Sequence, residues 1–226
     1  MWLACGAAIF CFLFFSCAAY GIGTFGRKQL GGDLWLCRGL GNLLGQLCGL
    51  ALGALILWKL KICALRSAVK GIPYAVILGR GYLILFASLL LYKLLLFDLE
   101  FYFQLQPSDQ NAMKAFKECM AADPKAFIWF ALAAAIGAPL VEEVIFRGLL
   151  YSGLRQKFDW LPTALISSFI FAFVHGDPWQ FLGLFGLGFA FAWVREKTGS
   201  LSAPMILHAV NNSFAILMFV TSPDAK

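Results

Sequence analysis

The chain has 226 residues, of which 61% are hydrophobic and 13% are charged, with a mean hydropathy of +0.80. Soluble domains carry about 45–50% apolar and about 25% charged residues, and disordered chains combine low hydrophobicity with high charge, so the composition excludes both classes. Six segments contain no Asp, Glu, Lys or Arg, and a seventh is interrupted only by Arg80 and Lys93: residues 2–26, 39–58, 126–141, 160–176, 178–194, 198–223 and 71–97. Because a transmembrane helix needs roughly 20 mostly apolar residues, we expect an all-α, polytopic transmembrane helical bundle of about seven spans.

The net charge of +6 does not indicate a nucleic-acid partner, because the basic residues flank the apolar segments instead of forming one polar face. Anionic lipid headgroups and the positive-inside rule place Lys and Arg at such positions. The flanking residues are Arg27, Lys28, Lys59, Lys61, Arg66, Lys70, Arg155, Lys157, Arg195 and Lys197. We expect the lipid bilayer, and no nucleic acid, as the surroundings of this chain.

The chain is expected to form a single membrane domain, residues 1–226. Three spans occupy residues 1–97, a polar connection occupies 98–125, and four further spans form a core at 126–221. The first apolar segment is longer than the h-region of a signal peptide, which has about 7–15 residues, and no basic region precedes it, so we interpret it as the first span. Within the polar connection, the helical spacing of Ala112, Met113, Phe116 and Met120 predicts a short interfacial helix.

Cysteine and glycine are both expected to serve packing in the first part of the chain. The seven cysteines show neither CxxC nor metal-ligand spacing, and most lie in apolar segments, where Cys behaves as a small hydrophobe. Small residues recur at spacings of two and four in the second span, which lets helices approach closely in lipid: Gly39, Gly41, Gly45, Gly49 and Gly53. Arg80, deep in the third span, is interpreted as structural or snorkelling.

Ionisable and amide side chains concentrate in the last four spans. The set contains both histidines of the chain: Glu142, Glu143, Arg147, His175, His208, Asn211 and Asn212. Polar residues inside a bilayer are costly and usually mark a functional site. We therefore expect the site inside the membrane, between the last four helices.

Helical spacing separates the roles of these residues. Glu143 and Arg147 are four positions apart and can pair on one face, whereas Glu142 is rotated by about 100° and faces elsewhere. His208 and Asn212 are also four apart and share a face of the last span. Counting the rise along each helix puts Glu142, His175, His208 and Asn212 at similar depths, so one site can contain all four.

Two kinds of chemistry fit this set. A carboxylate and an imidazole can activate water as a general base, and the Asn amide can stabilise an oxyanion. Alternatively, the same four residues, Glu142, His175, His208 and Asn212, can ligate zinc. The HExxH signature of helical zinc proteases is missing, which favours water activation without a metal or another cofactor.

Three motifs in order resemble one family. They are EExxxR at Glu142–Arg147, FxxxH at Phe171–His175 and HxxxN at His208–Asn212, with Thr198–Pro204 (TGSLSAP) adding to the likeness. Together they resemble the CAAX prenyl protease and bacteriocin-processing (CPBP, Abi) family of intramembrane endopeptidases, over residues 126–221. The resemblance implies that Glu142 and His175 activate water, that His208 and Asn212 form the oxyanion hole, and that Glu143 and Arg147 hold the architecture.

We therefore expect a membrane-embedded endopeptidase that cuts a membrane-attached peptide or protein, near its C-terminus in the prenylated precedent of the family. The small size and short loops favour a multi-pass protein of a bacterial cytoplasmic membrane. The alternatives are a zinc-dependent protease on the same residues and a non-catalytic membrane scaffold or immunity protein. A transporter is the third, but it predicts ionisable residues spread through the membrane and inverted repeats.

Overall fold

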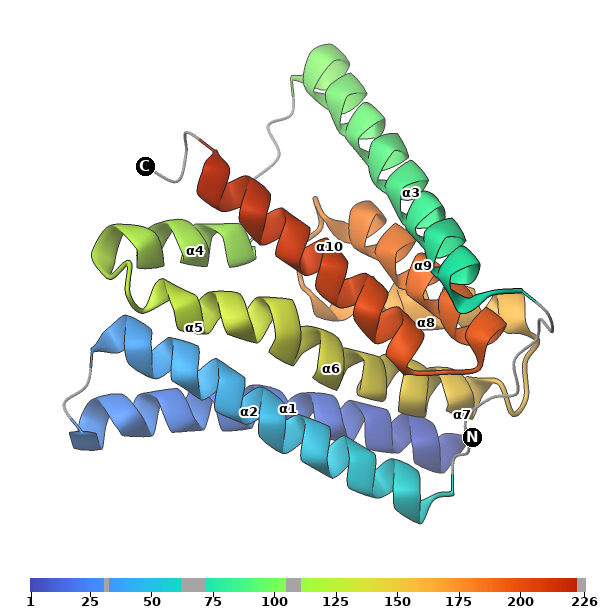
Figure 1. The fold of residues 1–226 in the computed structure, drawn as a ribbon, viewed down its shortest axis with the longest axis horizontal. Coiled ribbons are helices and arrows are strands. Elements are labelled where there is room, and N and C mark those ends of the chain that lie inside the picture. The colour runs from blue at the N-terminus through green and yellow to red at the C-terminus, as the bar shows by residue number, and fades with distance from the viewer. Residues whose placement is uncertain (31–32, 62–71, 105–110, 223–226) are drawn as a thin grey trace.

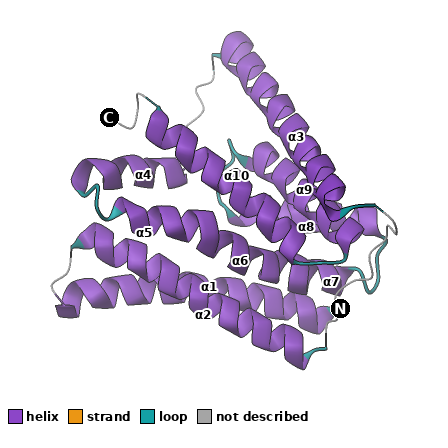
Figure 2. Ribbon diagram, in the orientation of Figure 1, coloured by secondary structure: helices purple, strands orange, loops and turns teal. Residues whose placement is uncertain are grey.

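The computed structural model describes residues 1–30, 33–61, 72–104 and 111–222, and within these ranges the chain forms helices and no strand (Figures 1 and 2). The first half contains α1 (Trp2–Leu30), α2 (Leu34–Lys59), α3 (Tyr74–Phe103) and the short α4 (Asn111–Ala122). The second half contains α5 (Phe127–Leu132), η1 (Ala133–Gly137), α6 (Ala138–Glu143), η2 (Val144–Tyr151), α7 (Ser152–Leu154), α8 (Trp160–Val174), α9 (Phe181–Thr198) and α10 (Ser202–Thr221). The expected all-α class is confirmed, and each of the seven apolar segments contains a helix.

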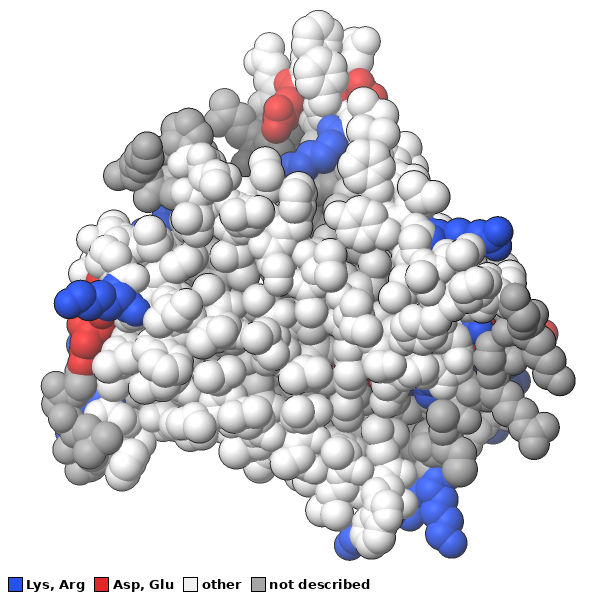
Figure 3. All heavy atoms as spheres, in the orientation of Figure 1, with Lys and Arg blue, Asp and Glu red and all other residues white. Residues whose placement is uncertain are grey.

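The protein is an integral membrane protein by the length and composition of its helices. Among the described residues, five helical stretches are long and apolar enough to cross a membrane: Trp2–Lys28, Leu34–Lys59, Tyr74–Tyr102, Phe127–Leu154 and Ser202–Thr221. The other two expected spans are α8, which has 15 residues, and α9, whose last turns contain Arg195, Glu196 and Lys197. On the face drawn in Figure 3, charged side chains lie toward the edges and a broad uncharged area separates them.

Residues 127–154 form one long helix that runs through the middle of the bundle, between the α1–α2 pair and α10 (Figure 1). Two stretches of this helix, η1 and η2, are π-helical, and Pro139 lies between them at the start of α6. Because proline has no backbone N–H and its ring crowds the preceding turn, the helix widens around it instead of continuing as a regular α-helix.

Glycines of α2 bring it into close contact with two neighbours at once. Gly41 and Gly45 face α1, where an added Cβ would lie 2.7 Å from the backbone of Gly23 and 2.6 Å from that of Ala19. Gly39 and Gly53 face the central helix, against Phe130 and Val144. The packing role predicted for these small residues is confirmed, and it fixes α1 and α2 as a tightly packed antiparallel pair beside the central helix.

Helix α3 packs on the opposite side, mainly against α9. Gly81 approaches Val194, Ser88 approaches Gly186, and the ring of Tyr92 lies over Gly183. The order of these contacts makes the two helices antiparallel. Figure 1 shows that the rest of α3 leans away from the bundle.

Helix α4 joins a second, smaller apolar cluster. Phe116 contacts Phe127 of α5 and Phe219 of α10, with ring centroids 5.5 and 5.9 Å apart. The helix predicted in the polar connection is therefore present, while its position at a membrane interface stays a prediction.

The described cysteines are free and support packing roles; Cys63 lies outside the described residues. Burial of Cys119 on α4 raises the pKa of its thiol above the ordinary value, which disfavours a reactive thiolate there.

The position of Arg195 contradicts the prediction that the basic residues at span ends face lipid headgroups. Its side chain is 2% exposed, and the guanidinium donates hydrogen bonds to the backbone oxygens of Arg147 and Gly199. Next to it, Glu196 accepts from Tyr151 Oη at 2.9 Å and from Arg155 at 3.1 Å, which raises the pKa of the Arg155 guanidinium. Because the end of α9 lies against the central helix, these charges are bonded within the protein instead of in the headgroup layer.

The α1–α2 contact yields a direct test of this packing. We expect Gly45→Val to destabilise the protein by about 1–3 kcal/mol, because the larger side chain overlaps the α1 backbone at Ala19. Gly21→Val is the matched control, since an added Cβ at Gly21 meets nothing within 4 Å. Thermal melting in detergent should separate the two variants, and equal melting temperatures would contradict the described packing.

Candidate active site

Glu142 lies between two histidines from different helices. Its Oε2 is 4.0 Å from Nε2 of His175, at the end of α8, and 4.0 Å from Nε2 of His208, on α10. These separations exceed a direct hydrogen bond of about 2.7–3.2 Å, but each leaves room for a water molecule between Glu142 and a histidine. The side chain of His175 is 28% exposed and that of His208 is 6% exposed. The group is therefore accessible from the side on which His175 lies.

The other ring nitrogen of each histidine is bound to an acceptor. His175 Nδ1 is 2.6 Å from the backbone oxygen of Phe171, and His208 Nδ1 is 3.0 Å from Oε1 of Glu143. A carbonyl and a carboxylate accept hydrogen bonds, so this network assigns a proton to both Nδ1 atoms. In their neutral forms, the two imidazoles therefore present lone pairs on Nε2 toward Glu142.

Glu143 and Arg147 form the expected pair, with Arg147 Nη1 3.1 Å from Glu143 Oε1 and both side chains fully buried. Arg147 also donates to the backbone oxygen of Gly188 at 2.9 Å. Its guanidinium lies 4.7 Å from the centroid of the Phe171 ring and 5.2 Å from that of Phe191. The single atom Glu143 Oε1 thus connects the arginine to His208.

Aromatic rings hold the histidines in place. Phe171 contacts His175 with ring centroids 4.7 Å apart, as the spacing of four along α8 predicts, and Phe191 stacks on His208 at 4.6 Å. Both phenylalanines also contact Arg147. The rings and the hydrogen bonds therefore restrict both imidazoles to one orientation.

The cluster gathers two carboxylates, a guanidinium and two imidazoles inside the bundle. Ionisable groups at the depth of a membrane span are costly and usually mark a functional site. The concentration of five such groups around Glu142 and Glu143 therefore makes this the candidate site of the chain.

A cavity of about 450 Å³ opens beside Glu142, His175, His208 and Asn212, and all four line it. Asn212 Nδ2 donates to the backbone oxygen of Ala134 in η1 at 2.9 Å, and Asn212 Oδ1 accepts from Asn211. The remaining walls are mostly apolar, from Leu89, Met113, Phe116, Leu184, Leu187 and Ile216. This volume and lining are typical of a ligand site.

Sequence reasoning missed one charged residue of this cavity. Lys93 of α3 lines it and lies 5.6 Å from the centroid of the Tyr92 ring. Its interruption of an otherwise uncharged segment was the available signal. Sequence reasoning also missed the hydrogen bond between Glu143 and His208, because residues 65 positions apart show no spacing relationship.

The donor geometry gives limited support to a metal. Tetrahedral zinc with ligands at about 2.0–2.1 Å brings its donor atoms to about 3.3–3.4 Å from each other, whereas the Glu142–His separations are 4.0 Å. Within the described part of the chain, no group of three or more His, Cys, Asp or Glu side chains has the geometry of a metal site. The two Nε2 lone pairs with bonded Nδ1 atoms are nevertheless the form in which histidine binds metals.

Part of the chain is similar to a known protein family. Residues 124–214 match the family model described as Rce1-like, type II CAAX prenyl endopeptidase. This segment is therefore similar to the CAAX prenyl endopeptidases. The resemblance inferred from the three motifs is confirmed, and the match contains Glu142, His175, His208 and Asn212.

Curated bacterial relatives are similar to part of the chain. The membrane-embedded CAAX protease MroQ of Staphylococcus aureus (strain USA300) is 30% identical over 106 residues, covering 44% of this chain and 41% of MroQ. A Bacillus subtilis (strain 168) protein provisionally named as membrane peptidase YdiL is 33% identical over 87 residues, covering 38% of this chain and 36% of YdiL. The aligned part is therefore about two fifths of each relative's length. No solved structure matches the chain.

The buried Glu143–Arg147 pair gives a stability prediction. Glu143→Gln removes the charge partner of Arg147 in a dry environment, so we expect a loss of about 3–5 kcal/mol. Arg147→Ala should share the defect, and the double variant should lose less than the sum of the two. Melting in detergent tests this, with Glu100→Gln, an exposed carboxylate on α3, as the control. A stable Glu143→Gln together with an unstable Glu142→Gln would reverse the roles of the adjacent glutamates.

Proposed function

We propose that the protein is an intramembrane endopeptidase that hydrolyses a peptide bond of a membrane-attached peptide or protein. The observation that carries the proposal is Glu142 Oε2 at 4.0 Å from two oriented Nε2 atoms, beside a cavity of about 450 Å³. The match of this segment to the CAAX prenyl endopeptidases supports the same reaction. Bacterial relatives and the apolar helices support a multi-pass protein in a bacterial cytoplasmic membrane.

In the proposed mechanism, a water molecule occupies the gap next to Glu142. It donates one hydrogen bond to Glu142 Oε2 and the other to Nε2 of His175, whose Nδ1 proton is held by the Phe171 carbonyl. Glu142 takes a proton as the water oxygen attacks the scissile carbonyl carbon. The same proton then moves to the leaving nitrogen as the C–N bond breaks.

The negative oxygen that forms on the carbonyl needs donors. Asn212 Nδ2 supplies its second N–H, since the first is bonded to the Ala134 oxygen. His208 supplies a donor in the form in which both ring nitrogens carry a proton, with Nδ1 bonded to Glu143 Oε1. We therefore assign His208 and Asn212 to the oxyanion, and Glu143 and Arg147 to holding His208 in place.

Two alternatives to a metal-free hydrolase make different use of the same residues. In a zinc-dependent protease, Glu142, His175, His208 and Asn212 would hold the ion, which would polarise the attacking water. In a non-catalytic scaffold or immunity protein, the catalytic residue types would not need to be kept. All three motifs are intact in this chain. The intact motifs and the 4.0 Å separations favour the metal-free hydrolase.

The catalytic assignment predicts a separation of activity from stability. Glu142→Gln, His175→Ala and His208→Ala should each lower the cleavage rate of a membrane-anchored reporter by about 10²-fold or more. Glu142→Gln should melt like the unmodified protein, and Glu100→Gln should keep full activity. Cleavage at the normal rate by the His175→Ala, His208→Ala double variant would contradict the site.

The metal question is answered with the same purified protein. Elemental analysis should find no stoichiometric zinc, and activity should survive dialysis against a strong chelator. One zinc per chain, with activity lost on chelation and restored by zinc, would replace the metal-free mechanism with the zinc-dependent one.

Lys93 predicts a preference for cleavage near a substrate's C-terminus. A lysine that lines an intramembrane cavity is expected to face an anionic group, and a terminal carboxylate is the anion that every peptide carries. Lys93→Gln should therefore raise KM about tenfold or more for a peptide with a free C-terminus, by removing a charge-assisted hydrogen bond. The same change should leave the KM for its C-terminal amide unaltered.

Arg80→Gln is the control for this experiment, because Arg80 is exposed on the same helix and does not line the cavity. Equal effects of Lys93→Gln on the free and amidated peptides, or no effect on either, would remove Lys93 from substrate recognition.

A further inference from the structure

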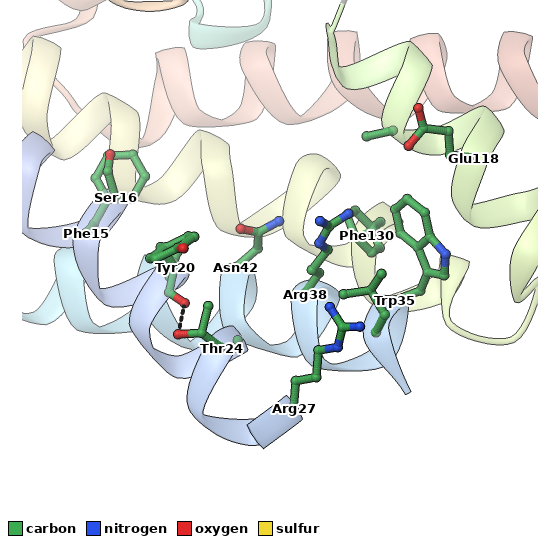
Figure 4. Close-up of a pocket in the computed structure, with 14 residues that line it drawn as sticks. Phe15, Ser16, Tyr20, Thr24, Arg27, Trp35, Arg38, Asn42, Glu118 and Phe130 are labelled. Carbon is green, nitrogen blue, oxygen red and sulfur yellow. Dashed lines mark hydrogen bonds between the residues drawn. The ribbon is translucent and has the colours of Figure 1, made fainter. Parts of the chain in front are cut away.

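A second cavity lies where α1 ends and α2 begins, between α1, α2, α4 and α5 (Figure 4). Its volume is about 610 Å³, and it shares no lining residue with the cavity at Glu142. Its walls combine apolar or small residues with hydroxyl and amide groups. Phe15, Ala19, Gly23 and Phe130 form the apolar part, and the polar part consists of Ser16, Tyr20, Thr24 and Asn42. The proposed protease mechanism makes no use of this cavity.

Two arginines from different helices meet at this cavity. Arg27 belongs to the last turn of α1 and Arg38 to the beginning of α2, and Figure 4 shows both guanidinium groups directed into the same space. The Arg38 guanidinium lies 5.2 Å from the centroid of the Trp35 ring, which in turn packs on Phe130 at 5.9 Å. These contacts orient Arg38 toward the cavity.

The opposite wall carries a carboxylate. Glu118 of α4 lines the cavity across from the arginines, and Figure 4 shows its carboxylate facing the same space. Among the interactions of the described residues, no ion pair joins Glu118 to Arg27 or Arg38. The cavity therefore presents two positive charges and one negative charge at separate positions, all available to a ligand.

The position of the cavity at the ends of two spans gives it a charged part and an apolar part. Arg27 and Lys28 end α1, and Asp33 caps α2 by accepting from the backbone N–H groups of Trp35 and Leu36. Charged residues at the ends of two adjacent spans mark the headgroup region of a membrane. Below them, Phe15 and Ala19 continue the cavity wall along an apolar helix.

We propose that this cavity binds one glycerophospholipid with a phosphoethanolamine headgroup. Its phosphate lies between Arg27 and Arg38, where guanidinium groups donate paired hydrogen bonds to phosphate oxygens. Its ammonium group pairs with Glu118, and its acyl chains follow the apolar wall along α1. Basic pockets between transmembrane helices bind lipid headgroups in this way, and a soluble phosphate ester shares the headgroup chemistry without using the apolar wall.

Native mass spectrometry of the full chain in detergent tests the proposal, with phosphatidylethanolamine added stepwise. We expect one tightly held lipid per chain, and at least about tenfold weaker binding in the Arg27→Gln, Arg38→Gln double variant, which loses two charge-assisted contacts. Arg80→Gln removes the same charge from an exposed site outside the cavity and should bind normally. Unchanged lipid binding by the double variant would overturn the site.

Glu118→Gln gives an independent readout from another helix. It should weaken binding of phosphatidylethanolamine and spare phosphatidylglycerol, which has no ammonium group; equal effects on both lipids would overturn the assigned orientation. Displacement of the lipid by glycerophosphoethanolamine at a similar concentration would assign the cavity to a soluble phosphate ester instead. Melting temperatures verify that the variants are folded, and cleavage is not measured, so failure of the protease proposal leaves this result intact.

Discussion

A positive charge enclosed in a helix bundle within a membrane has to find its counter-charge and its acceptors inside the protein. Arg147 does so through the Glu143 carboxylate, the Gly188 carbonyl and the faces of Phe171 and Phe191. These partners come from the central helix, α8 and α9, and Glu143 extends the network to His208 on α10. The requirement to satisfy one arginine therefore brings together the helices that carry the site, and Glu142, one position before the buried pair, faces the open space.

The remaining helices support this arrangement from outside. Glycines of α2 hold α1 and α2 against the side of the central helix away from His208, at approaches that no larger side chain would allow. Helix α3 covers the other side through α9 and contributes Lys93 to the cavity. The first half of the chain, which carries none of the three motifs, thus supplies both the mechanical support of the site and one of its charges.

The sequence was most informative about contacts between residues of the same helix, because the helical repeat relates them. A spacing of four predicted the Glu143–Arg147 pair and the Phe171–His175 contact, and uncharged segments predicted the helices. It was least informative for contacts between distant segments, such as His208 with Glu143. Arg195 shows a different limit: a basic residue at the end of a span looks the same whether it meets lipid or a neighbouring helix. The π-helical stretches also escaped prediction, because counting at 3.6 residues per turn assumes a regular helix.

The π-helical stretches determine which way part of the central helix faces. Each contains more residues per turn than an α-helix, so it acts as an insertion that the helix absorbs without breaking. One residue more or fewer turns the next segment by about 100° about the helix axis. The segment Ala138–Glu143 has such a stretch at both of its ends. The two wide stretches therefore set the rotation at which Glu143 meets Arg147 and His208 while Glu142 lines the cavity.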